Sequence, residues 1–157
     1  MPSSPVPALF DIDPVAAMRW QRQQSHASPW LHEEVAQRML QRLDVIRLQP
    51  EQWLHWQPEQ GGLKAHEALL HRYSQARAWQ MPGSSSPAPC SIDMLWANMV
   101  LDKAIDPRDV LAQWRRLLSP DGFVMFSVLG PGSFPELRSL YQARGWAPPC
   151  HAFTDIH

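Results

Sequence analysis

The most constraining feature of this sequence is a short connection between a predicted strand and a predicted helix. Residues 53–56 are typical of a buried strand, and residues 63–73 are typical of the helix that follows. The connection reads Gln-Pro-Glu-Gln over residues 57–60 and has glycines only at Gly61 and Gly62. A strand that turns directly into a helix is typical of α/β folds in which a ligand faces the helix N-terminus.

The residues of this connection are unusual for a tight ligand-binding turn. Glycine serves such turns because it tolerates positive φ and places no Cβ between the backbone and the ligand. Pro58 has a fixed φ and no N–H to donate. Glu59 places a negative charge where an anionic or electron-rich group would be held. The connection therefore predicts weak binding at this position.

Length and charge limit the classes of protein to consider. A chain of 157 residues is large enough for one domain with a real core. Its 14 Lys and Arg residues against 15 Asp and Glu residues give a net charge of −1, which does not favour nucleic acid or an anionic membrane as partner. No apolar run approaches the roughly 18 residues of a membrane span. The N-terminus lacks a basic residue and a signal-type apolar core, so we expect a cytoplasmic protein.

Proline, tryptophan and cysteine indicate how the chain is organised. The 16 prolines concentrate at the N-terminus, at residues 82–89 and at residues 148–149. We expect a flexible leader with a weak helix over residues 1–28, and one α/β domain over residues 29–157 with a Ser/Pro linker at 82–90. The eight Trp residues are interpreted mainly as core, with a ligand-stacking platform as the alternative. Cys90 and Cys150 are too few for a disulfide framework and are expected to be free thiols.

The remaining periodicity alternates between helix and strand. We predict helices over 11–24, 31–46, 63–73, 107–118 and 134–144, strands over 53–56, 76–81, 92–97 and 123–129, and a turn over 119–122. Asp106 and Pro107 form a helix start, as N-cap and first helical residue. The unbroken apolar strand over 123–129 is typical of a parallel sheet covered on both faces. The pattern predicts an α/β fold with a mostly parallel sheet and right-handed crossovers.

Several of these segments resemble one enzyme family. They are Ser-Ile-Asp-Met-Leu-Trp-Ala-Asn over 91–98, Leu-Ala-Gln-Trp-Arg-Arg-Leu-Leu-Ser-Pro-Asp-Gly-Phe over 111–123, and Gly-Ser-Phe-Pro-Glu-Leu-Arg over 132–138, with further similarity over 31–38 and 153–157. Together they resemble the class I S-adenosylmethionine-dependent methyltransferases, and within them the biotin-synthesis type, BioC, which are malonyl-acyl-carrier-protein O-methyltransferases. The resemblance implies a reduced Rossmann-like core. It also implies methyl transfer from S-adenosylmethionine to a carboxyl group, such as that of a carrier-bound malonyl thioester.

The departures from this family fall on the cofactor site. The family's acidic residue and Gly-x-Gly-x-Gly motif align on His55, Gln57, Glu59 and Gly61, of which only Gly61 matches. The acidic residue that the family places after the second strand is missing at residues 80–82. About thirty residues, which in the family form a helix, a third strand and an adenine-contacting Asp, are absent before residue 92. Gly61, Gly62 and Asn98 are left as vestigial cofactor positions, with a structural cap as the alternative for Asn98.

Other polar residues have plainer interpretations. His55, His66 and His71 match no zinc pattern, and His66 and His71 are five residues apart on a helix, so we predict no metal site. Asp93 is interpreted as a sheet-edge or cap residue. Arg115 and Arg116 are interpreted as a solvated helix face, with docking to an acidic carrier protein as the alternative.

The sequence therefore predicts a degenerate, non-catalytic methyltransferase homologue that acts as a binding or assembly module and binds S-adenosylmethionine weakly or not at all. The alternative is an active O-methyltransferase with an atypical cofactor loop. We also expect a homodimer, because the apolar strand over 123–129 and the opposite side of the sheet would both be open edges. The alternative is that further chain covers the edge.

Overall fold

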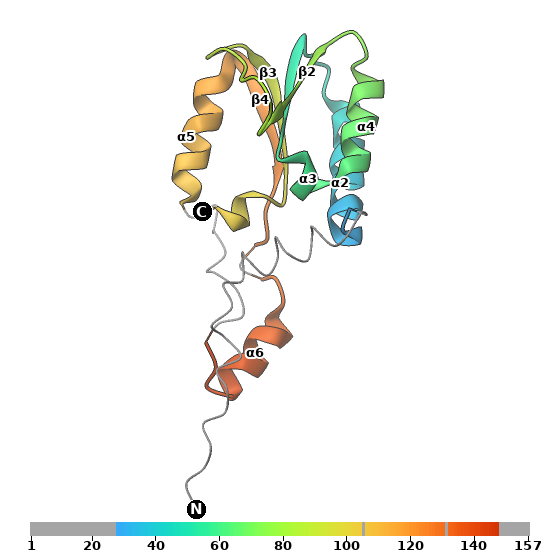
Figure 1. Cartoon of the computed structure of the whole chain (residues 1–157). Coiled ribbons are helices and arrows are strands. Elements are labelled where there is room, and N and C mark those ends of the chain that lie inside the picture. Colours follow the sequence, from blue (N-terminus) through green and yellow to red (C-terminus); the bar gives the residue numbers. More distant parts are fainter. Residues whose placement is uncertain (1–27, 105, 131, 148–157) are drawn as a thin grey trace, which may run out of the picture.

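The computed structural model describes residues 28–104, 106–130 and 132–147, and it has a parallel sheet between two helical layers (Figure 1). In chain order the elements are α2 (Trp30–Arg42), η1 (Leu43–Val45), β1 (Gln52–Trp56), α3 (Pro58–Gly61), α4 (Leu63–Arg72), β2 (Arg77–Met81), β3 (Ile92–Asn98), η2 (Leu101–Lys103), α5 (Pro107–Leu117), β4 (Leu118–Ser127) and α6 (Pro135–Ala143). The strand order is β2-β1-β3-β4, and every neighbouring pair is parallel. The predicted α/β fold with a parallel sheet is confirmed.

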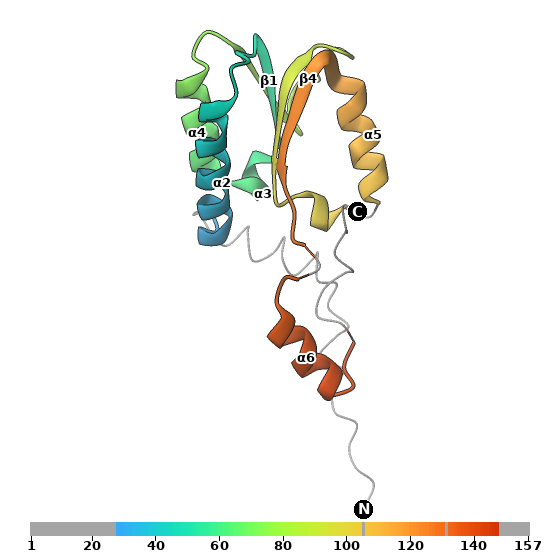
Figure 2. The ribbon, with the colours of Figure 1, turned by 180° about the vertical axis from the view of Figure 1, so that it is seen from behind.

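Each face of the sheet has its own core. Helices α2 and α4 cover one face and α5 covers the other, as the view from behind also shows (Figure 2). Trp53 and Trp96 are buried on the α2 and α4 side, and Trp114 is buried on the α5 side. The interpretation of tryptophan as core is confirmed for these three. Trp30, 77% exposed at the start of α2, and Trp146, 43% exposed, are counterexamples.

The helix boundaries agree with the sequence signals, with small shifts. The Asp106 side chain accepts a hydrogen bond from the Arg108 N–H at 2.8 Å, and Pro107 occupies the first helical position of α5. This is the predicted cap. The helix predicted over 31–46 ends earlier, because the chain tightens into η1 at Leu43, whose side chain is fully buried.

The chain passes directly from β2 to β3. Among the described residues no helix or strand lies between Met81 and Ile92, as predicted for the Ser/Pro segment. Cys90 lies at the end of this connection as an exposed free thiol. The linker role expected of residues 82–90 stays a prediction. The helix predicted over 11–24, together with Cys150 and the segment 153–157, lies outside the described residues.

The predicted turn over 119–122 is wrong, because these residues lie inside β4. The partner of β3 jumps from Leu118, opposite Ile92, to Phe123, opposite Met94. Four residues of β4 therefore face the single residue Asp93, which is a bulge. The Ser-Pro-Asp-Gly signal marked a real irregularity, but the ladder continues on both sides of it.

Gly122 in this bulge is expected to be intolerant of a side chain. A Cβ there would lie 2.6 Å from the Ile92 carbonyl oxygen, which belongs to the backbone and cannot turn away. We expect Gly122→Ala to lower the free energy of unfolding by about 1–3 kcal/mol, measured by urea denaturation. Gly130→Ala is the matched control, because a Cβ there meets nothing within 4 Å. Equal stability of the two variants would contradict this account of the bulge.

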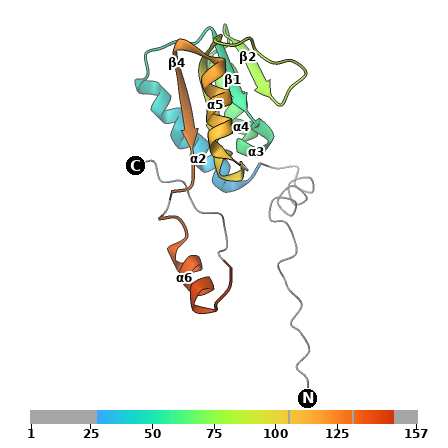
Figure 3. The ribbon, with the colours of Figure 1, turned by 90° about the vertical axis from the view of Figure 1, so that its left-hand side faces the viewer.

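Two features of the C-terminal part bear on association. β4 is at the edge of the sheet, as predicted for the strand over 123–129. Helix α6 follows it and lies beyond the carboxyl ends of the strands, away from the helical layers (Figure 3). None of the α6 side chains is buried.

In the described part of the chain, no helix combines the length and apolarity needed to cross a membrane.

Candidate functional site

The three predicted cofactor positions meet at the carboxyl ends of β1 and β3. Parallel α/β sheets bind their ligands at this edge. Gly61 ends the short helix α3 and lies directly against Asn98, the last residue of β3: a Cβ on Gly61 would be 2.9 Å from the Asn98 carbonyl oxygen. A Cβ on Gly62 would lie 3.6 Å from Asn98 Nδ2. The structure thus brings Gly61, Gly62 and Asn98 together.

Asn98 is fully buried, and its amide is engaged by the protein itself. Its Nδ2 donates to the carbonyl oxygen of Gly61 and, at 2.8 Å, to that of His32 in α2. Its Oδ1 accepts a hydrogen bond from Ser127 Oγ at 2.7 Å. Both amide hydrogens are therefore used. The Asn98 side chain therefore links α2, α3 and β4. This is the structural role that the sequence left open for Asn98 as the alternative to cofactor binding.

The connection after β1 is not an open loop. Gln57 adopts a left-handed conformation with φ of 52°, and Pro58 then begins the one-turn helix α3. The N–H groups of Gln60 and Gly61 donate to the Gln57 carbonyl oxygen at 2.9 and 3.0 Å, and that of Gly62 donates to Pro58 at 3.0 Å. These backbone donors are turned into α3 instead of toward a ligand.

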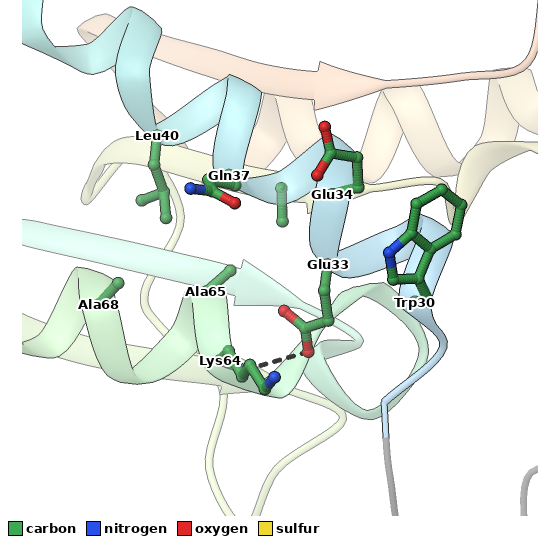
Figure 4. A pocket seen from close by; sticks show the side chains of 9 residues that line it. Trp30, Glu33, Glu34, Gln37, Leu40, Lys64, Ala65 and Ala68 are labelled. Carbon is green, nitrogen blue, oxygen red and sulfur yellow. Dashed lines mark hydrogen bonds between the residues drawn. The ribbon is translucent and has the colours of Figure 1, made fainter.

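The N-terminus of α4 is capped by residues of another segment. Glu33 Oε1, from α2, accepts the Lys64 N–H at 3.2 Å, a contact drawn as a dashed line in Figure 4. Ser28 Oγ accepts the Leu63 N–H at 3.4 Å. A helix N-terminus is the place where an anionic ligand group would bind. Here the Glu33 carboxylate holds that position, which sequence reasoning missed because the contact joins residues 31 apart.

A groove of about 380 Å³ lies between α2 and α4, next to this cap (Figure 4). It is lined by Trp30, Glu33, Glu34, Ala36, Gln37, Leu40, Lys64, Ala65 and Ala68. None of the predicted cofactor positions lines it. Trp30, which is exposed, lies at one end of this groove. The sequence alone does not place Trp30 beside a groove, because that position follows from the packing of α2 on α4.

The structure joins two of the three histidines in a hydrogen-bonded chain. His55 Nδ1 on β1 lies 3.2 Å from His66 Nδ1 on α4, and His66 Nε2 lies 2.6 Å from the Gln80 amide nitrogen on β2. The Nε2 atom of His55 is buried and has no hydrogen-bond partner in the described part of the chain.

This environment disfavours charge on both rings. Burial first, and the adjacent His66 second, lower the pKa of His55 to about 3. Burial also lowers the pKa of His66, an effect that the nearby Glu67 carboxylate opposes. His71 is exposed and takes no part in the chain. Over the described ranges, no three His, Cys, Asp or Glu side chains are grouped as a metal site would need.

The remaining candidates have structural surroundings. Asp93 Oδ2 accepts the N–H groups of Glu51 and Gln52 at 3.0 Å, and its Oδ1 accepts from Ser119 Oγ at 3.1 Å. It joins the start of β1 to the bulge of β4, so its interpretation as a cap is confirmed. Arg115 and Arg116 are exposed near the end of α5.

Comparison with curated proteins supports the resemblance seen in the sequence. The chain is 27% identical to a malonyl-[acyl-carrier protein] O-methyltransferase of Methylovorus sp. (strain MP688) over 83% of its length, and 28% identical to the protein of that name from Gallionella capsiferriformans (strain ES-2), also over 83%. A shorter match, 37% identical over 67 residues, covers 43% of the chain and 23% of the protein of that name from Laribacter hongkongensis (strain HLHK9). No family model matches, and no solved structure matches.

The fold and these matches define an α/β chain similar to the class I S-adenosylmethionine-dependent methyltransferases. Within that class, the similarity is to the BioC type, the malonyl-[acyl-carrier protein] O-methyltransferases.

The chain spans about half the length of the curated relatives that it matches over most of its residues: 54% of the Methylovorus protein and 56% of the Gallionella protein. The Methylovorus alignment has 163 positions but includes 83% of a 157-residue chain, or about 130 residues. Roughly 33 aligned positions of the relative therefore have no counterpart in this chain.

Proposed function

We propose that this chain is a degenerate, non-catalytic homologue of the BioC-type methyltransferases that serves as a binding or assembly module. The observation that carries the proposal is that groups of the protein itself occupy the backbone donors beside the carboxyl ends of β1 and β3. The Glu33 carboxylate caps α4, and the N–H groups of the former glycine loop bond within α3. A cofactor would have to displace both sets of contacts before it gained its own.

The end of β2 supports the same proposal. The family resemblance implies an acidic residue there to hold the ribose hydroxyls, and this chain has Gln80 followed by Met81 and Pro82. The Gln80 side chain is already bonded to His66. A neutral amide bonds a hydroxyl less strongly than a carboxylate does. Two of the positions that depart from the family, His55 and Gln80, are linked to each other through His66.

The alternative is an active O-methyltransferase that uses S-adenosylmethionine and acts on a carboxyl group, such as that of a carrier-bound malonyl thioester. Its support is that the matched curated relatives carry the name malonyl-[acyl-carrier protein] O-methyltransferase. Gly61 and Gly62 also remain at the loop, and Gly62 keeps a φ of 125° that favours glycine.

Calorimetry with S-adenosylmethionine tests the proposal. Losing several loop and ribose hydrogen bonds, each worth roughly 0.5–3 kcal/mol, leaves an expected dissociation constant no tighter than about 1 mM. A micromolar dissociation constant that is lost in Gly62→Val would contradict the proposal, because Val is strained at this φ and would block binding at this loop. Circular dichroism of both proteins shows that they are folded.

Partners and location belong to the same proposal. We propose a homodimer, since β4 is an open edge in the described sheet. An acyl carrier protein is the second candidate partner, and the exposed Arg115 and Arg116 would meet its acidic surface. A cytoplasmic location is expected for either partner.

A further inference from the structure

We propose that His55 and His66 form an acid-sensitive link that holds α4 on the sheet, and that proton uptake by this pair releases α4 while the α5 layer stays in place. This link is separate from the proposed function, because it does not depend on whether the chain binds a cofactor.

His66 connects α4 to two strands of the sheet. Its Nδ1 lies 3.2 Å from Nδ1 of His55 on β1, and its Nε2 lies 2.6 Å from the Gln80 amide nitrogen on β2. The His66 ring also lies beside Trp53, with 5.4 Å between the ring centres. His55 is fully buried, whereas His66 is half-buried. Any change in the contact between the two rings therefore acts on the attachment of α4.

The contact between the two rings tolerates one positive charge but not two. Two Nδ1 atoms that face each other form a hydrogen bond only when one carries a hydrogen and the other does not. When both rings are charged, both Nδ1 atoms carry hydrogens, so two N–H groups would face each other across 3.2 Å. The two positive rings would also repel each other. The doubly charged pair is therefore incompatible with the closed position of α4, whichever ring carries the shared hydrogen at neutral pH.

The groups that face the pair do not offset two charges. From β2 and β3 they are the neutral side chains of Gln80 and Trp96. On α4, burial lowers the pKa of the half-buried ring by more than the adjacent Glu67 carboxylate raises it, and Lys64 is itself positive. From α2, the Glu33 carboxylate accepts the Lys64 N–H. Separation from the sheet is therefore the way in which the second charge gains water.

The apolar attachment of α4 is small. Of its ten residues, Ala65 and Leu69 are buried, whereas Leu63 and Leu70 are exposed. Hydrophobic stabilisation grows with the apolar area removed from water, and segments with few buried contacts open first. The contacts of His66 therefore carry a large share of what keeps α4 in place.

The α5 layer serves as an internal reference. The buried residues of the core beneath it are apolar, among them Leu54, Leu95 and Trp114. The contacts of His55 with His66 and with Trp96 lie on the other face of the sheet. Acid therefore acts on the α4 layer at a pH at which we expect the α5 layer to remain protected.

Hydrogen exchange read by mass spectrometry between about pH 7 and about pH 4 tests this link. The rates are corrected for the pH dependence of exchange in an unfolded chain. We expect exchange in α4 to rise relative to that in α5 as the pH falls, by up to about tenfold per pH unit for each proton taken up on opening. Equal loss of protection in α4 and α5 over this range would overturn the proposal.

The variant His66→Asn removes one titrating ring and keeps a polar partner for His55. The asparagine amide donates from about the place of the imidazole Nδ1 and does not titrate. We expect a shallower pH dependence of α4 exchange, because His55 alone is left to take up a proton. His71→Asn is the matched control, since His71 is exposed on the same helix and should keep the wild-type dependence. The same dependence in both variants would contradict the role of His66.

NMR titration of the imidazole signals gives a second readout that needs no variant. In the wild-type chain, we expect the α4 amides to lose protection as the second ring of the pair becomes charged. Two charged rings with α4 still protected would overturn the proposal.

Discussion

Asn98→Ala should lower the free energy of unfolding by about 3 kcal/mol. The substitution removes the partner of the His32 and Gly61 carbonyl oxygens and of the Ser127 hydroxyl, at a side chain that is itself fully buried. An unsatisfied buried polar group costs about 1–3 kcal/mol, and partial access of water to two of the three partners limits the sum.

Thermal denaturation measures this effect, with an expected fall in Tm of roughly 6–12 °C for a chain of this size. Gln113→Ala is the matched control, since it removes an exposed amide from α5. The result separates two roles of Asn98. A residue held open for a ligand would lose affinity with little change in the stability of the free protein, so an unchanged Tm would contradict the structural role assigned to it.

Acid should destabilise the protein through His55. The folded-state pKa of about 3 lies below the ordinary value of 6.5, because burial disfavours the charged ring. Below pH 6.5 the unfolded chain takes up a proton that the folded chain refuses until about pH 3. Stability is therefore complete above pH 6.5 and falls as the pH drops toward 3, by about 1.4 kcal/mol for each pH unit and on the order of 4–5 kcal/mol in all.

Urea unfolding at several pH values tests this. His55→Phe keeps a ring against Trp96 without a titrating nitrogen, so its stability should depend less steeply on pH between 6.5 and 3. Leu69→Ala is the control, because it weakens the same core without removing a histidine and should keep the wild-type slope. Identical slopes for the wild type and His55→Phe would show that His55 does not govern the acid response.

The strands and long helices were predictable because their signals are local. The apolar runs predicted β1, β3 and the C-terminal half of β4. Asp106 and Pro107 predicted the start of α5. The bulge over residues 119–122 was misread as a turn, since proline and glycine mark a break in the backbone but not whether the ladder resumes. Whether the ladder resumes after the bulge depends on Ile92 and Asp93, which lie on the neighbouring strand β3.

The site was predictable as a set of positions but not as a set of contacts. Gly61, Gly62 and Asn98 do converge. The short helix α3 was not foreseen, because Gln57 adopts a left-handed conformation that nothing local demands. The cap by Glu33 and the chain from His55 to Gln80 were also missed, since each joins residues that meet only after α2, α4 and the sheet have packed.

The most direct measurement of the central claim is an NMR titration of the amide signals of the loop with S-adenosylhomocysteine. The signals of Gly61, Gly62 and Lys64 report on the donors that bond within α3 or to Glu33. With these donors engaged, we predict no saturable change in the three signals up to about 1 mM ligand. Saturable shifts of Gly62 and Lys64 at micromolar ligand would mean that Glu33 yields its place to the cofactor, and would contradict the account of a closed, non-catalytic site.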